Sequence, residues 1–463
     1  MKIRRLSFLL ALLTVFSMSS CGAAENRTAD ATAAGEFSPT ADAVGGASEG
    51  GIIAKREDYS ADDIGTAAGA EGGDFEYEYP ADGVTESVMD SETFGDAAIE
   101  GVEKSEASER TEIFEEDYSY DDVFNSQSQA GLLTSGEWND NENFDFWKNL
   151  ISSRQDWSGV SYRWGLDTSN RIAVNIKSES GAAEGVKVKL MSGTTVLWES
   201  VSDNKGNAYL FDDFKGNDQF IPTQIIAEKD GVKLAEVEYK EGDTVGIDIK
   251  DVTKNAPSLD LMFVVDTTGS MGDELNYLQT ELTDIVERVA AENQIPVRVS
   301  VNFYRDTTDQ YVVRSFDFTN SVGEAVRNIQ AQSANGGGDY AEAVEQALED
   351  AVYNHSWNED STKLMFLVLD APPHYSNAIS QKLGNVLAKA SEEGIRVIPV
   401  ASSGVDTETE YLCRTFSIAT GGTYTFLTDH SGVGGSHLEP TVGHYQVEKL
   451  NDMIVRIIGE YIG

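Results

Sequence analysis

Basic residues are scarce in this chain. Its 463 residues include 34 Lys and Arg against 79 Asp and Glu, which gives a formal net charge of −45 at pH 7. Nucleic-acid binding needs a basic surface that neutralises phosphates, so this balance excludes DNA and RNA as expected partners. The acidic excess is concentrated near the start, because residues 22–150 hold 32 acidic and 6 basic side chains, a net of −26.

Cysteine is almost absent, with only Cys21 and Cys413 in the chain. Cys413 falls within a predicted helix at residues 409–420, where a free cysteine usually packs as a small apolar residue. Cys21 lies just after an N-terminal apolar run. If Cys21 carries a lipid, no disulfide can form within the chain.

The apolar run at residues 6–16 is too short to cross a bilayer. It follows the positively charged residues 2–5 and precedes Met18-Ser19-Ser20-Cys21, which is the layout of a signal sequence. Small residues before a cysteine resemble the lipobox of bacterial lipoproteins. That resemblance implies a signal peptide at residues 1–20, lipid attachment at Cys21, and a lipid-anchored location on the extracytoplasmic side of a bacterial cell membrane. The alternative is an ordinary cleaved signal with an incidental cysteine.

The next two segments differ in aromatic content. Residues 21–131 are rich in Ala, Gly, Ser, Asp and Glu, and their apolar residues follow no period, which predicts a disordered acidic tether. Residues 132–165 contain four tryptophans and two phenylalanines. This density favours an aromatic segment that docks onto a folded surface, with an exposed ligand platform as the alternative.

Residues 166–252 alternate apolar and polar side chains in short runs, for example at 171–176, 186–190 and 208–211, with turn residues between the runs. This pattern predicts a small all-β sandwich. It resembles the carboxypeptidase regulatory-like or prealbumin-like modules of bacterial surface proteins, which implies a spacer or a partner-docking module.

Residues 255–463 alternate strand and helix patterns. Fully apolar runs at 261–265 and 364–369 predict strands buried on both faces, and residues 275–289 and 344–351 have helical spacing. The other expected elements are strands at 297–303, 312–318, 396–401 and 423–427 and helices at 378–393, 409–420 and 446–461. This alternation predicts an α/β fold with a doubly wound, mostly parallel sheet.

Oxygen-bearing side chains follow two of these strands and an intervening loop. Asp266, Thr268 and Ser270 come directly after the first apolar run, Asp370 ends the second, and Asp339 follows three glycines. Ligands of such open sheets bind outside the carboxyl ends of the strands. Hard oxygen ligands with no basic residue among them suit Mg²⁺, or alternatively Mn²⁺ or Ca²⁺.

The same residues resemble the metal-ion-dependent adhesion site of the von Willebrand factor type A family. That site has the pattern Asp-x-Ser/Thr-x-Ser, then a Thr or Asp in a later loop, then an Asp that closes a strand. The resemblance implies that the metal is held by Asp266, Thr268, Ser270 and Asp370. In the loop, either Asp339 is a direct ligand or Gly338 takes that place and water completes the shell.

Other residues of the same rim have less specific roles. His374 is expected to contact a bound partner, against the alternative of a rim residue positioned by two prolines. Asp306 either orients water or a hydroxyl beside the metal or pairs with Arg305. Three histidines, His430, His437 and His444, are seven residues apart, a spacing that matches no common zinc site, and surface positions are expected for them.

The resemblance implies a binding protein rather than an enzyme. Its metal would take a carboxylate or another oxygen ligand from an extracellular or envelope protein or glycan. The alternative is a structural subunit of a cell-envelope assembly, in which the metal only stabilises the rim. An enzyme is not expected, because the chain lacks a Gly-x-Ser-x-Gly elbow, a P-loop and a His-Glu-x-x-His motif.

Overall fold

The computed structural model describes residues 52–53, 129–216, 220–240, 242, 244–252, 256–292 and 294–463. The predicted signal peptide, Cys21 and nearly all of the predicted tether lie outside these residues. Within the described part of the chain, no helix combines the length and the apolar character that a bilayer crossing requires.

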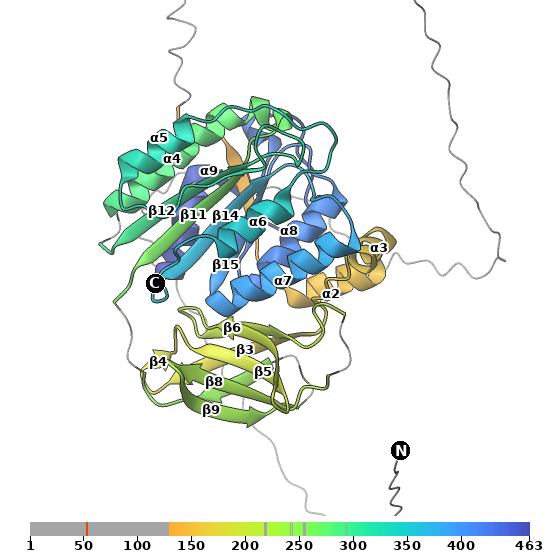
Figure 1. Cartoon of the computed structure of the whole chain (residues 1–463), viewed down its shortest axis with the longest axis vertical. Helices are drawn as coiled ribbons and strands as arrows, with labels where there is room; N and C mark the ends of the chain where they lie inside the picture. The colour runs from red at the N-terminus through yellow and green to blue at the C-terminus, as the bar shows by residue number, and fades with distance from the viewer. Residues whose placement is uncertain are drawn as a thin grey trace, which may run out of the picture. The chain divides into compact units, whose positions relative to one another are not determined.

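The largest sheet runs in the order β1-β17-β2-β16-β15-β14-β11-β12-β13. Its strands β15, β14, β11 and β12 are labelled in Figure 1. The adjacent central strands β16, β15, β14, β11 and β12 are parallel to one another. The strands on either side of them, β13 at one edge and β2, β17 and β1 at the other, pair antiparallel. The bounds are β1 Ile52–Ile53, β2 Thr134–Trp138, β11 Leu259–Asp266, β12 Val297–Tyr304, β13 Val313–Arg314, β14 Thr362–Leu369, β15 Ile395–Ala401, β16 Tyr424–Leu427 and β17 Gln446–Lys449.

Helices cover both faces of this sheet (Figure 1). Leu261 and Phe263 of β11 share an apolar cluster with α4, α5 and α9, whereas Met262 and Val264 share another with α6, α7 and α8. Successive strand residues point to opposite faces, so a strand covered on both sides must be apolar throughout. The predicted doubly wound, mostly parallel α/β sheet is confirmed. The helices are α4 Leu275–Glu292, α5 Val322–Gln330, α6 Val344–Tyr353, α7 Asn377–Glu393, α8 Thr407–Thr420 and α9 Leu450–Ile462, with short 3₁₀ turns η1 Gly269–Asp273 and η2 Asp429–Ser431.

The aromatic segment before residue 165 packs against α8, one of the helices that cover the main sheet. Besides β2, it forms α2 (Phe144–Ser153) and α3 (Gln155–Trp164). Trp147 and Trp157 are fully buried, and the Trp147 ring stacks on Tyr411 of α8 with centroids 5.7 Å apart. Because β2 lies between β16 and β17, the main sheet includes residues far upstream of the boundary predicted at residue 255.

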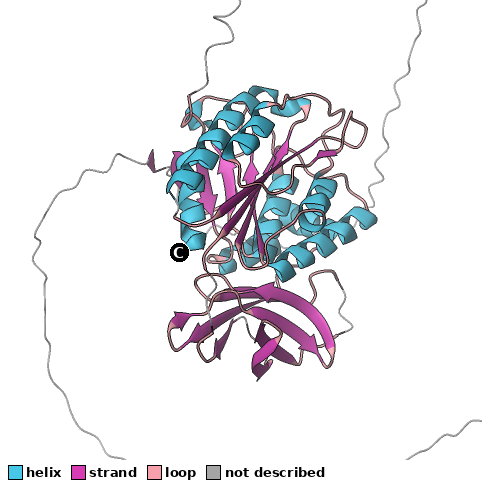
Figure 2. Cartoon of the chain, turned by 60° about the vertical axis from the view of Figure 1, so that its left-hand side comes forward, coloured by secondary structure: helices cyan, strands magenta, loops and turns pink. Residues whose placement is uncertain are grey.

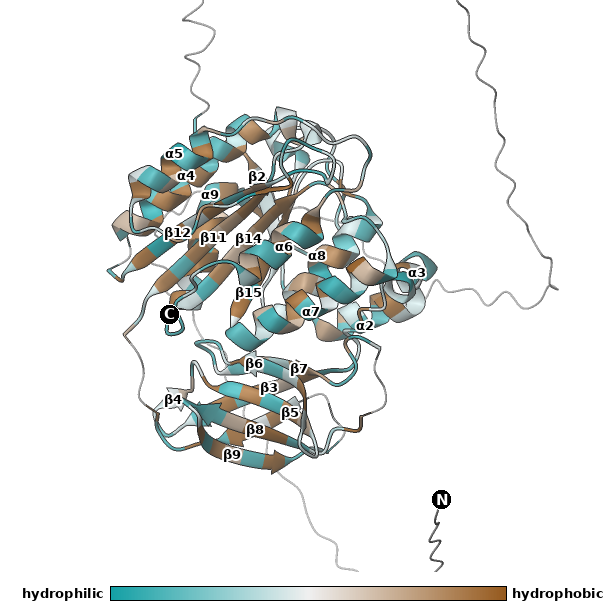
Figure 3. Cartoon of the chain, in the orientation of Figure 1, coloured by the Kyte–Doolittle hydropathy of each residue, from teal (hydrophilic) through white to brown (hydrophobic). Residues whose placement is uncertain are grey.

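Residues 171–248 form two four-stranded sheets (Figure 2). Alternate residues of β3, such as Ile172, Val174 and Ile176, are buried in the core. Trp198 of β6 reaches α7, where its Nε1 donates to Ser391 Oγ at 3.1 Å. Colouring by hydropathy shows apolar residues recurring along these strands between polar ones (Figure 3). The strands are β3 Arg171–Ser178, β4 Gly181–Ala182, β5 Lys187–Ser192, β6 Thr195–Val201, β7 Asn207–Phe211, β8 Gln224–Lys229, β9 Val232–Glu238 and β10 Thr244–Asp248.

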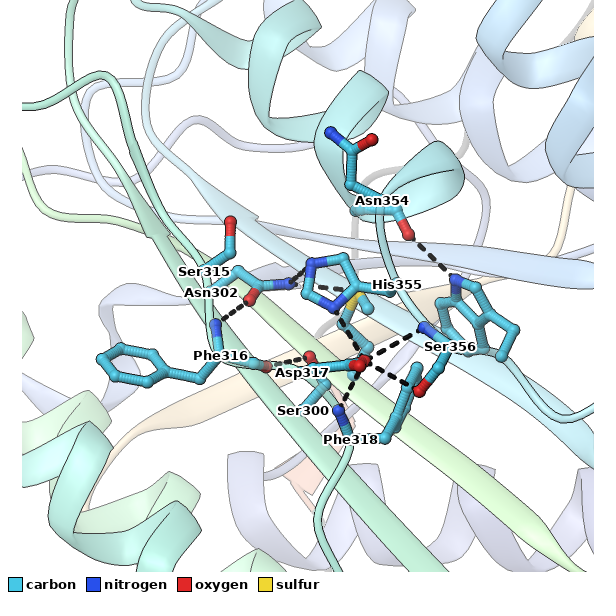
Figure 4. A network of polar contacts seen from close by, with 12 residues as sticks. Ser300, Asn302, Ser315, Phe316, Asp317, Phe318, Asn354, His355 and Ser356 are labelled. Atoms are coloured by element: carbon cyan, nitrogen blue, oxygen red, sulfur yellow. Dashed lines mark hydrogen bonds and ion pairs between the residues drawn. The ribbon is translucent and has the colours of Figure 1, made fainter.

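The strand predicted at residues 312–318 is shorter than expected. Within residues 312–318, only Val313–Arg314 forms strand pairs with β12. Beyond that pair, β12 side chains hold the backbone of Phe316, whose N donates to Asn302 Oδ1 at 2.9 Å and whose O accepts from Ser300 Oγ at 2.8 Å (Figure 4). The prediction was wrong for residues 315–318, because side-chain hydrogen bonds replace the backbone ladder there.

The helix predicted at residues 446–461 starts later. Gln446–Lys449 is strand β17, which pairs with β2, and α9 begins at Leu450. The backbone N of Leu450 donates to the carbonyl of Leu133 at 2.9 Å. The apolar spacing was correct for α9, but the pairing partner that makes β17 a strand lies about 300 residues earlier in the chain, beyond the reach of a local pattern.

Candidate metal centre

Three neighbouring strands bring the candidate residues to one edge of the main sheet. Asp266 is the last residue of β11, and Asp370 directly follows β14. Asp266 is in register with Tyr304, the last residue of β12. Since these strands are parallel, their carboxyl ends lie side by side.

Asp266 organises the turn that follows it. Its Oδ1 accepts from the backbone N of Thr268 at 2.8 Å and from the Thr268 hydroxyl at 2.7 Å. The hydroxyl oxygens of Thr268 and Ser270 lie 3.1 Å apart. Aspartate favours such turns because its side chain can bond to the backbone two residues later. One short turn therefore presents a carboxylate and two hydroxyls together.

Asp370 joins this group from β14. Burial raises the pKa of Asp370, against the opposing effect of a hydrogen bond from Ser270, and the nearby charge of Glu274 raises it further. Burial, followed by the charge of Asp370, raises the pKa of Asp266. A cation beside these two carboxyl groups would favour their ionised forms.

Several oxygens of the group have unsatisfied bonding capacity. Within the described part of the chain, Asp266 Oδ2, Asp370 Oδ1 and Glu342 Oε2 are buried and have no hydrogen-bond partner. The buried Tyr304 hydroxyl lies close enough to Asp266 to lower its pKa, yet not in hydrogen-bonding geometry. Buried polar atoms nearly always have a partner. An all-oxygen donor set with orphaned carboxylate oxygens fits Mg²⁺.

The group opens into a pocket of about 350 Å³. The pocket is lined by Ser270, Asp273, Asp339, Tyr340, Glu342, Asp370, Ala371, Ser403, Gly404, Gly435 and Ser436. Four of these residues are acidic and none is Lys or Arg. An anionic ligand would therefore be repelled from the pocket unless a cation is bound there.

Glu342 is a part of the site that the sequence analysis missed. It is 2% exposed and lies immediately before α6. Burial, then the charges of Asp266 and Asp306, raise the pKa of Glu342 to about 9. The sequence feature that could have indicated its burial is its position directly before Ala343 and Val344, which are both fully buried.

Asp339 lines the same pocket as Ser270 and Asp370 and also belongs to a second group of side chains. Asp306, Asp339 and His374 each have one potential ligand atom within 4.8 Å of the others. Among the described residues, this is the group of His, Cys, Asp and Glu side chains close enough together to hold a metal ion. Gly338 lies beside Asp339 on an exposed part of the loop, with open space around it.

Asp306 is not paired with Arg305. The Arg305 guanidinium donates to the carbonyl oxygens of Thr267 at 3.1 Å and Ser333 at 2.8 Å. Asp306 Oδ1 instead lies 2.7 Å from His374 Nε2. Of the two alternatives for Asp306, the ion pair with its neighbour in sequence is therefore absent from this structure.

The three histidines of the last loop do not converge. His437 lies between two carboxylates, with Nε2 3.1 Å from Glu274 Oε1 and Nδ1 2.7 Å from Asp429 Oδ1. His430 and His444 are exposed. This loop therefore uses His437 to attach itself to Glu274, just after η1.

Comparison with known proteins identifies the domain that carries the site. Residues 260–437 match the family model described as von Willebrand factor A domain. The chain is 34% identical over 128 residues to an ariadne-like RING finger protein of Acanthamoeba polyphaga mimivirus. It is 26% identical over 152 residues to the alpha-protein kinase vwkA of Dictyostelium discoideum. These matches cover 27% and 32% of this chain but 12% and 24% of those proteins, so the chain spans a minor part of their length.

Among solved structures, the conserved hypothetical protein BatB from Bacteroides thetaiotaomicron aligns with 14% identity and a TM-score of 0.31, over 44% of this chain and 98% of that one. The family match coincides with the strands and loops that hold Asp266, Asp339 and Asp370. The chain therefore contains a von Willebrand factor A domain at residues 260–437, a module of the protein-interaction or adhesion type.

Proposed function

We propose that this domain binds a divalent cation, Mg²⁺ in the first instance, through Asp266, Thr268, Ser270 and Asp370. The cation takes a carboxylate or another oxygen ligand from a protein or glycan partner. The observation that carries the proposal is the acidic pocket, in which buried carboxylate oxygens lack partners and no basic side chain is present. When bound, the cation supplies a positive point charge and an open coordination position for the partner's oxygen.

The chain's own residues have separate tasks in this arrangement. Asp266 and Asp370 supply negative charge, and Thr268 and Ser270 supply neutral oxygens on a turn that the Asp266 hydrogen bonds hold in place. The two carboxylates formally balance a divalent cation, and the neutral hydroxyls add oxygen ligands without adding negative charge. The cation thus offsets the negative charge of the pocket, so that a partner's carboxylate can reach the open coordination position.

We further propose that the protein acts without catalysing a reaction, at the extracytoplasmic face of a bacterial cell membrane, where a lipid on Cys21 would anchor it. The support is the run of basic, apolar and small residues before Cys21. Incorporation of radiolabelled palmitate by the wild-type chain, and its loss in Cys21→Ser, would test the anchor.

The metal site is tested by calorimetric titration of Mg²⁺, Mn²⁺ and Ca²⁺ into the full chain. We expect saturable Mg²⁺ binding by the wild type and its loss in Asp266→Asn, which keeps the shape of the side chain but removes its charge. Asp145→Asn is the matched control, because the Asp145 side chain is 99% exposed and lies outside the domain. Unchanged Mg²⁺ binding by Asp266→Asn would refute the site.

The partner is tested with immobilised peptides that carry Asp or Glu, paired with versions that carry Asn or Gln. We expect retention of the carboxylate peptides in Mg²⁺, and loss of retention in EDTA or with Asp266→Asn. A structural-subunit role predicts something else: Mg²⁺ would raise the melting temperature, while retention would be the same in Mg²⁺ and in EDTA.

A further inference from the structure

A second group of potential metal ligands lies beside the first. It consists of Asp306, which follows β12, Asp339, which follows the triple glycine, and His374, which follows β14. His374 Nε2 and Asp306 Oδ1 are 2.7 Å apart. One ligand atom from each of Asp306, Asp339 and His374 lies within 4.8 Å of the other two. Three loops that are distant in sequence therefore converge on a small volume.

The backbone around this group is braced by a fourth carboxylate. Asp309 Oδ2 accepts from the backbone N of Asp306 at 3.1 Å and from the backbone N of Gly337 at 2.8 Å. These two bonds join the loop of Asp306 to the loop of Asp339. The loop of His374 is joined in turn to Glu342, whose N donates to the carbonyl of Pro372 at 3.0 Å. Such outer bonds hold ligands in position before a metal binds.

His374 alone does not balance the negative charges of Asp306 and Asp339. Asp306 is 4% exposed and Glu342 is 2% exposed. Glu342 Oε2 has no hydrogen-bond partner, and Glu342 lines the same pocket as Asp339. Arg305, the nearest basic residue in sequence, is committed to two carbonyl oxygens and to the ring of Tyr311, 4.6 Å from its centroid. Among the described residues, neither Asp306 nor Asp339 forms an ion pair with a Lys or an Arg.

We propose that Asp306, Asp339 and His374 bind a second divalent cation of the first-row transition series, such as Mn²⁺ or Zn²⁺, with Glu342 placed between this ion and the first site. One imidazole with two carboxylates is a donor set for such ions, whereas the hydroxyl and carboxylate oxygens around Asp266 suit Mg²⁺. Three protein ligands also leave coordination positions open for water or for a partner's oxygen. Asp339 thus belongs to the second ion.

The two sites use different residues, so one can exist without the other. Mn²⁺ titration of the full chain in excess Mg²⁺, followed by electron paramagnetic resonance, separates them. We expect one bound Mn²⁺ per chain under these conditions, and modulation of its spin echo by a directly bonded ¹⁴N nucleus. His374→Gln should remove the nitrogen signal and weaken Mn²⁺ binding beyond the about 10- to 100-fold cost of losing an outer-shell contact.

Three other variants make the result interpretable. Asp339→Asn alters an exposed residue with little consequence for folding, and we expect it to weaken Mn²⁺ in the same way. His444→Gln is the matched control, because His444 is exposed in a different loop and should leave the signal unchanged. Asp266→Asn should abolish Mg²⁺ binding yet keep the Mn²⁺ with its nitrogen signal.

Three outcomes would overturn the second site: no Mn²⁺ retained in excess Mg²⁺, a retained ion without ¹⁴N modulation, or a signal that His374→Gln leaves intact. Loss of the nitrogen signal in His374→Gln together with normal Mg²⁺ binding by Asp266→Asn would support the second site while refuting the first. Circular dichroism of each variant establishes that the folded state is retained.

Discussion

Asp140 and Arg414, 274 positions apart in sequence, form a two-bond ion pair in which neither side chain is exposed to solvent. Arg414 Nε donates to Asp140 Oδ2 at 2.8 Å, and Nη2 donates to Oδ1 at 2.7 Å. The guanidinium also lies over the rings of Trp147 and Trp157, at 4.9 and 5.1 Å from their centroids. The pair fixes the segment after β2 to α8.

Removal of Asp140 should be costly, because the buried Arg414 would lose its two-bond partner and keep only Glu410, at 3.2 Å, as a counter-charge. We expect Asp140→Asn to lower the free energy of unfolding by about 3–5 kcal/mol, measured by urea denaturation. Asp156→Asn is the control, since it removes a half-exposed pair with Arg154 and should cost at most about 1 kcal/mol. Equal effects of the two substitutions would contradict a structural role for the buried pair.

The hydroxyl of Thr268 should matter more than its methyl group. Thr268→Val keeps the shape but loses the hydroxyl that donates to Asp266 and lies 3.1 Å from Ser270. We expect Mg²⁺ affinity in calorimetry to fall by more than the about 10- to 100-fold cost of losing an outer-shell contact, because this oxygen is a proposed direct ligand. Thr268→Ser retains the hydroxyl and should bind close to wild type, so parallel losses in both variants would count against direct use of this oxygen.

The metal-free protein should become less stable as the pH rises. A carboxyl group with a raised pKa in the folded state contributes its full stability below its unfolded pKa, and loses it as the pH rises through the folded pKa. For Glu342 this window runs from about 4, its value in an unfolded chain, to about 9. We expect the melting temperature in EDTA to decline across that window.

Mg²⁺ should counteract this decline, because it competes with protons for the same oxygens. The increase in melting temperature on adding Mg²⁺ should therefore be larger at pH 8 than at pH 5. Glu342→Gln should flatten the decline in EDTA, whereas the exposed Glu359→Gln should leave it as in the wild type. A Mg²⁺ effect that is greatest at pH 5 would run against the linkage.

Two glycines of the triple-glycine loop should respond differently to substitution. Gly336 has a φ of +83°, and a Cβ there would overlap the Asp309 carboxylate. Gly336→Ala should cost about 1–3 kcal/mol of stability for the left-handed backbone alone. Gly338 has neither constraint, so Gly338→Ala should stay within about 0.5 kcal/mol in the same urea titration. If Gly336→Ala left the free energy of unfolding unchanged, the loop would have to adapt easily to the added Cβ.

The central strands were predictable because their signal is local. The run at residues 364–369 is apolar throughout, and β14 is indeed covered by helices on both faces. β17 could not be found in this way: Gln446, Glu448 and Lys449 give no strand pattern, and only pairing with β1 and β2 makes them a strand. Long-range pairing leaves no periodic trace in a polar sequence.

The candidate site likewise contains a part that is determined locally and a part that depends on distant loops. Asp266, Thr268 and Ser270 lie within five residues, so a local turn determines how they are arranged. The environment of Asp339 depends instead on Asp306 and His374, which come from two other loops. Glu342 was missed for a similar reason, since its backbone bonds to Pro372 and bridges to Pro373, which belong to another loop.

The position of β2 also has a kinetic consequence. The hydroxyl oxygens of Thr134 and Thr428, 294 positions apart in sequence, lie 2.9 Å from each other. The carbonyl oxygen of Leu133 accepts a hydrogen bond from the backbone N of Leu450. A chain must close its longest loops before such contacts stabilise it, so folding dominated by them is slow. Thr134–Trp138 has no strand to pair with until β16 and β17, which come late in the chain, are free to fold. The end of the main sheet's sequence thus determines when one of its earliest strands can join the sheet.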